Sequence, residues 1–106
     1  MGRKYKFYDN TKLYFVTFTV VDWIDIFTRR AYIEIIYDSF RFCQRKKNLE
    51  LYAYCIMTNH IHLIMGTETG LLTDIVRDFK SFTSRHIRKA IKKTLKKVEK
   101  YGYLRI

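Results

Sequence analysis

The 106-residue chain contains no proline and only four glycines. These two residues normally mark turns and linkers, so their scarcity leaves no stretch with the character of a flexible linker or a domain boundary. The sequence also shows no internal repeat. A chain of this length can build one modest hydrophobic core. We therefore expect a single domain over residues 1–106.

Cysteine and membrane-spanning apolar runs are also scarce. The only two cysteines, Cys43 and Cys55, provide neither a disulfide framework nor the ligand spacing of a zinc site. The strongly apolar run from Leu13 to Val21 covers nine residues, which is too short to span a bilayer. The basic N-terminus is not followed by the apolar segment of a secretory signal. These absences predict a cytoplasmic protein with no membrane partner.

Negative charge is sparse, because ten Asp and Glu face 21 Lys and Arg and give a formal net charge of +11. Residues 71–100 alone hold ten Lys and Arg against three acidic residues, a balance of +7. Such a concentrated positive field attracts polyanions, nucleic acid first and an acidic membrane surface second. The plainer alternative is a solvated helix face. Of these readings we favour a nucleic-acid partner.

Apolar residues make up 48% of the chain, and their spacing predicts an alternation of strands and helices. Residues 13–21 are β-branched and aromatic, as in a central strand. Residues 31–47 have helical periodicity, with Thr28 as the expected N-cap and Asn48 in the left-handed position after the helix. Residues 49–57 alternate as a strand, with one face formed by Leu49, Leu51, Ala53 and Cys55.

The second half of the chain completes the pattern. Thr58 and Asn59 form a short polar break before the apolar run at 60–65, which predicts a hairpin. A long amphipathic helix follows over 71–98, Gly102 is expected to end it, and residues 103–106 add a short edge strand. We therefore predict an α+β fold, a ferredoxin-like βαββαβ antiparallel sheet with two helices on one face. A homodimer through an exposed sheet edge stays open.

Two histidines lie two residues apart inside the apolar run. On a strand His60 and His62 point to one side, roughly 7 Å apart at their α-carbons, while Ile61, Leu63 and Met65 point to the other. The apolar set should face the helices, so the histidines should project from the open side of the sheet. Two neutral imidazoles at this separation can reach one cation. The alternative is a pair of half-buried histidines that only pack and hydrogen-bond.

The stretch AYCIMTNHIHLIM, residues 53–65, resembles the His-hydrophobic-His motif of single-tyrosine transposases, particularly the REP-associated tyrosine transposases of bacteria. Members of that family carry Met-Pro-Asn-His-Val-His-Leu on a strand, and here Thr58 replaces the proline and Ile61 the valine. The opening strand KLYFVTFTV and the helix with its Lys80-Ser81 pair are similar to the family as well. The resemblance covers residues 5–92.

The resemblance implies a reaction. Family members bind Mg²⁺ or Mn²⁺ through the two histidines and a third ligand, often glutamine, and a tyrosine attacks single-stranded DNA that carries hairpins. For this chain it implies His60 and His62 as metal ligands. Our candidate DNA contacts are the basic residues of the second helix, Lys80, Arg85, Arg88, Lys89 and Lys92.

The family places its tyrosine on a further helix, with the third ligand four residues on. Here the only late tyrosines are Tyr101 and Tyr103, and Arg105, four residues after Tyr101, cannot ligate a cation. Gln44, the only glutamine, lies on the first helix, on the wrong side of the sheet. We take Tyr101 and Tyr103 as the candidate nucleophiles, and we expect a chain that is C-terminally truncated relative to the family and binds DNA without cleaving it.

Two other functions stay open. The same sheet could hold a DNA or RNA hairpin without cutting it, with Tyr52 and Tyr54 stacking on bases as in an RRM domain, although the RRM ribonucleoprotein motif is absent. The basic helix could instead meet an acidic protein partner. A metal-dependent covalent adduct with DNA separates the transposase from both alternatives.

Overall fold

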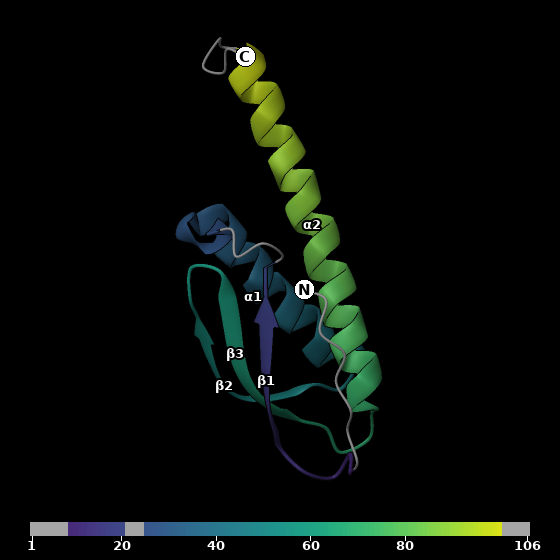
Figure 1. Cartoon of the computed structure of the whole chain (residues 1–106). Helices are drawn as coiled ribbons and strands as arrows, with labels where there is room; N and C mark the ends of the chain where they lie inside the picture. The colour runs from purple at the N-terminus through teal and green to yellow at the C-terminus, as the bar shows by residue number, and fades with distance from the viewer. Residues whose placement is uncertain (1–8, 21–24, 101–106) are drawn as a thin grey trace.

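The computed structural model describes residues 9–20 and 25–100, with side chains described as far as residue 96. Strand β1 (Tyr14–Thr19) is followed by the 3-10 turn η2 (Ile26–Thr28), helix α1 (Arg30–Lys46), strands β2 (Glu50–Ile56) and β3 (His60–Gly66), and helix α2 (Leu72–Lys100) (Figure 1). The predicted order of strand, helix, strand, strand, helix is confirmed over these residues. The edge strand at 103–106 and the helix end at Gly102 lie outside the described residues.

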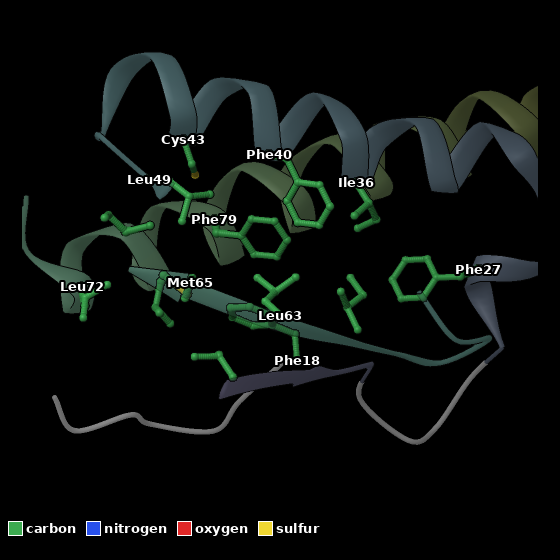
Figure 2. Packing of buried hydrophobic residues seen from close by; sticks show 14 of the residues in the cluster. Phe18, Phe27, Ile36, Phe40, Cys43, Leu49, Leu63, Met65, Leu72 and Phe79 are labelled. Atoms are coloured by element: carbon green, nitrogen blue, oxygen red, sulfur yellow. The ribbon is translucent and has the colours of Figure 1, made fainter. Parts of the chain in front are cut away.

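The three strands form one antiparallel sheet in the order β1-β3-β2. The central strand β3 pairs with β1 in the register Thr17↔His62 and with β2 in the register Cys55↔His62. The predicted mixed α+β sheet is therefore confirmed, while the full βαββαβ order and the homodimer stay predictions. Both helices lie on the same side of the sheet (Figure 2), so the other side, here called the open face, is not covered by either helix.

The core lies between the two helices and this one side of the sheet. Alternate residues of β3 point into it, and Ile61, Leu63 and Met65 are at most 2% exposed. They meet apolar side chains of both helices, of which Figure 2 labels Ile36, Phe40, Cys43, Leu72 and Phe79. The prediction that the apolar set of β3 faces the helices is confirmed.

The ends of α1 differ from the prediction at one position. Thr28 is not the N-cap: the helix begins at Arg30, Arg29 takes the cap position, and the cap makes no side-chain hydrogen bond. The Thr28 hydroxyl instead donates to the Asp25 carbonyl, 3.3 Å away, inside the 3-10 turn that precedes the helix. At the other end Asn48 has a φ of 59°, so its predicted left-handed conformation is confirmed.

Strand β2 contains a β-bulge that the alternating pattern did not predict. Leu51 pairs with Met65, but Ala53 pairs with Ile64, so Tyr52 is the extra residue. Beyond the bulge every side chain therefore changes face. Leu51 lies on the helix side, whereas Ala53 and Cys55 lie on the open face. The expectation that these three residues share one face is wrong.

The same bulge separates the two tyrosines that would stack on bases in the RRM-like alternative. Tyr54 turns toward α1, where its ring centroid lies 5.2 Å from that of Phe40 and 5.9 Å from that of Tyr37. Tyr52 is exposed, and its ring lies on the open face, close to the place that a side chain at Gly66 would occupy. Tyr54 is itself 48% exposed, but it lies on the helix side of the sheet, so the two tyrosines do not share the face that the RRM-like alternative would use.

Candidate metal and nucleic-acid site

Both histidines lie on the open face at the start of β3. They are half-buried, and their ring centroids are 4.7 Å apart with an interplanar angle of 78°. The intervening Ile61 is fully buried on the opposite side of the strand. The prediction that His60 and His62 project together from the open face is confirmed.

Each imidazole is oriented by a hydrogen bond at its Nδ1 atom. His60 Nδ1 lies 2.7 Å from the side-chain oxygen of Asn59, which accepts the hydrogen bond in the tautomer that has its proton on Nδ1. His62 Nδ1 lies 3.0 Å from the Thr17 hydroxyl on β1, which can donate or accept and so orients the ring in either tautomer. In a neutral ring protonated at Nδ1 the lone pair is on Nε2, which is how such outer hydrogen bonds prepare histidines for metals. Asn59 and Thr17 thus orient the two imidazoles, and sequence reasoning missed both contacts, although Asn59 directly precedes the pair.

The aromatic ring of Phe15 completes the surroundings of His62. Its centroid is 5.3 Å from that of the imidazole and the planes are inclined by 26°, so the two rings stack. Next to them the open face is hollowed by about 150 Å³ over Ala53, Cys55 and Ile64. Sequence reasoning missed Phe15 as well, although its position in β1 two residues before Thr17 put both side chains on one face.

The two imidazoles do not belong to a three-residue cluster of His, Cys, Asp or Glu side chains in the part of the chain that the structure describes, and within these residues no such group is arranged to hold a metal ion. Gln44 lies on α1, in the helix layer on the other side of the sheet. Tyr101 and Tyr103 lie outside the described residues.

The basic candidates lie on α2 and do not join the histidines. Arg85, Arg88, Lys89 and Lys92 are all exposed and point away from the core face of the helix, which is lined by Phe79, Thr83 and Ile87. Lys80 is half-buried on the flank of the same helix, and burial lowers the pKa of its ammonium group. Figure 1 shows that the C-terminal half of α2 extends past the end of the sheet. The cations thus form a surface on the helix layer, separate from the open face.

The family model described as "Transposase IS200 like" matches residues 12–104. The chain belongs to this family. The match spans nearly the whole chain, from just before β1 to beyond the end of α2, and so includes both histidines and the basic half of α2. The IS200-like transposases are the single-tyrosine family that the His-x-His stretch resembled, and that identification is confirmed.

Comparison with curated proteins and with solved structures returned no match for this IS200-like chain. In the described ranges no helix is both long enough and apolar enough to cross a membrane. Family membership implies DNA as the partner. The form of that DNA, the metal and the nucleophile have to be inferred from the geometry of the site.

Proposed function

We propose that this IS200-like transposase acts on single-stranded DNA that carries a hairpin, with His60 and His62 holding a divalent cation on the open face. The observation that carries the proposal is the pair of imidazoles, oriented by Asn59 and Thr17, in a chain that matches a transposase family over residues 12–104. The net charge of +11 supports a polyanionic partner.

The donor set fits a divalent cation in part. Two imidazole nitrogens suit Mn²⁺ better than Mg²⁺, because Mg²⁺ is a hard ion that prefers oxygen ligands. Since the described residues add no third carboxylate, thiol or imidazole, the other ligand positions would belong to water and to oxygens of the DNA. When bound, such a cation supplies Lewis-acid polarisation of a phosphate. The residues of this chain orient the two imidazoles and bring the strand to them.

The basic surface of α2 supplies the affinity in this proposal. Removal of the positive charges at Arg85, Arg88, Lys89 and Lys92 should weaken binding, because each cation that neutralises a phosphate releases counterions. A DNA that reaches both this surface and the histidines must pass from the helix layer to the open face. A folded stem joined to a flexible single strand can do so, whereas a stiff blunt duplex cannot follow that change of direction.

The first experiment measures binding by fluorescence anisotropy over a range of salt concentrations. Hairpin-bearing single strands should bind more tightly than blunt duplex of equal length. Changing the four cations of α2 to glutamine should make the slope of log affinity against log salt shallower by about three, since each phosphate contact to a single strand contributes about 0.7. The matched control removes four exposed cations of α1, namely Arg30, Arg41, Arg45 and Lys46. Equal effects of both variants, or equal affinity for duplex and hairpin, would contradict the proposal.

The second experiment asks whether this chain carries the nucleophile. End-labelled hairpin DNA is incubated with the protein and Mn²⁺, and a denaturing gel reports any covalent adduct. We expect binding without an adduct, because no His, Cys, Asp or Glu side chain among the described residues completes a three-residue metal site with the two histidines. An adduct that is lost in Tyr101→Phe or Tyr103→Phe would overturn this expectation and assign the tyrosine.

A further inference from the structure

The open face carries an apolar surface that a metal site does not require. Phe15 is 66% exposed, Tyr52 58% and Leu13 53%, although large apolar side chains are usually buried. Phe15 pairs with Ile64 across the β1–β3 ladder, and the Ile64 side chain is also exposed. The face beside the histidines is therefore aromatic and apolar, on a protein whose charge is strongly positive.

The exposed ring of Phe15 is supported by a contact on the open face. It stacks on His62, whose Nδ1 is in turn 3.0 Å from Thr17, the residue two positions after Phe15 on the same strand. The backbone pairs Phe15↔Ile64 and Thr17↔His62 fix both residues on the sheet. Rigid aromatic side chains of this kind bind flat partners at a low cost in conformational entropy.

The hollow beside this ring arises from the β-bulge. Beyond Tyr52 the bulge places two small side chains, Ala53 and Cys55, on the open face and turns the large Tyr54 toward α1. The surface over Ala53 and Cys55 is therefore lower than the Phe15 and Ile64 side chains that rise beside it. The resulting hollow of about 150 Å³ is mainly apolar and opens to solvent next to His62.

We propose that unpaired nucleobases stack on Phe15 and enter the hollow beside His62. Every base has an aromatic face, and stacking on a protein ring is tolerant of sequence. A duplex keeps its bases paired and stacked, so this surface would select single strands. The inference rests on the proposed function, because the bound strand would then hold a phosphate next to the imidazoles. The net charge of +11 favours a polyanionic strand over a second copy of the chain as the occupant of this surface.

Cys55 allows the wild-type protein to report on the hollow. Its thiol is exposed and lines the hollow, whereas Cys43 is fully buried and burial raises the pKa of its thiol to about 11. A thiol-alkylating reagent should therefore modify Cys55 alone, since the thiolate is the reactive form. The reaction is run with a chelator, so that no metal occupies the histidines.

Single-stranded oligothymidine should slow the alkylation of Cys55, whereas blunt duplex and an abasic strand of the same length should not. The Phe15→Ala variant should lower the affinity for oligothymidine by about 5- to 150-fold, the range for loss of one base–ring stack. Phe15→Trp should keep the affinity. Leu71→Ala is the matched control, because Leu71 is 54% exposed and lies directly before α2 rather than on the sheet.

The outcomes separate this inference from the proposed function. Alkylation that is slowed equally by the abasic strand, or an unchanged affinity of Phe15→Ala for a strand that wild type binds, would overturn the stacking inference alone. Failure of wild type to bind single-stranded DNA at all would instead overturn the proposed function. Because Phe15 is exposed, its variants should melt at nearly the wild-type temperature, which circular dichroism checks.

Discussion

Strand β3 offers a matched pair of isoleucines that tests which face of the sheet is covered. Ile61 is completely buried among core residues, whereas Ile64, three positions along the same strand, is 37% exposed on the open face. Removing a buried isoleucine side chain costs about 2–5 kcal/mol, because the transfer free energy is lost and a cavity remains. A surface substitution usually changes stability by no more than about 0.5 kcal/mol, so the partly exposed Ile64 should cost about 0.5–1 kcal/mol.

The assay is urea denaturation of Ile61→Ala and Ile64→Ala, and the free energies of unfolding are compared provided that the two variants have equal m-values. In thermal melts each kcal/mol should lower the midpoint by about 4–8 °C for a domain of this size. If Ile61→Ala does not fold, Ile61→Val serves instead, with an expected cost of about 0.5–1.5 kcal/mol against almost none for Ile64→Val. Equal costs would refute the assignment of faces, and so would a larger cost at Ile64, which is the result expected if the strand were shifted by one residue and its two sides were exchanged.

Four further substitutions test three particular contacts. Ser39→Ala should destabilise the protein by about 1–3 kcal/mol, because the buried Thr83 hydroxyl then loses its hydrogen-bond acceptor at 2.8 Å. The near-isosteric Thr83→Val should cost less, and urea denaturation of the two variants measures the difference. Gly70→Ala should destabilise by about 1–3 kcal/mol, because an added Cβ would lie 2.9 Å from the backbone carbonyl of Lys47, and a melting midpoint equal to that of wild type would argue against this loop geometry. Burial alone would raise the pKa of Asp78, but hydrogen bonds from Lys47 and Arg77 outweigh it and lower that pKa below the ordinary value of 3.8. The ionised carboxylate therefore stabilises the folded protein above pH 3.8, and this stabilisation is lost as the pH falls through the folded-state pKa. Asp78→Asn should therefore destabilise the protein at pH 7 and flatten the acid limb of its stability profile, and an unchanged limb would contradict the assignment.

Sequence periodicity predicted the elements of the fold because each element follows one simple pattern. The apolar face of β3, the amphipathic stripe of α2 and the left-handed Asn48 all come from local rules of spacing and backbone preference. The open-face position of His60 and His62 followed from the same alternation. The two-residue spacing of the histidines on a strand was enough to predict that they share the open face.

The rest depended on tertiary contacts that no local pattern encodes. The bulge at Tyr52 leaves no signal in an apparently regular alternation, yet it decides that Tyr54 packs on Phe40 and that Cys55 faces the solvent. The bond between Thr17 and His62 joins residues 45 positions apart. Thr28 was mistaken for a cap because a 3-10 turn uses its hydroxyl before the helix begins.

The most direct test of the metal site is a titration of the protein with Mn²⁺, observed through the side-chain nitrogen signals of its three histidines by NMR. His86 is an internal control, because it lies on α2 with its Nδ1 2.8 Å from the Phe82 carbonyl. The account predicts that substoichiometric Mn²⁺ broadens the Nε2 signals of His60 and His62 together and leaves His86 sharp. Equal broadening of all three histidines, or none at His60 and His62, would contradict a divalent-cation site on the open face.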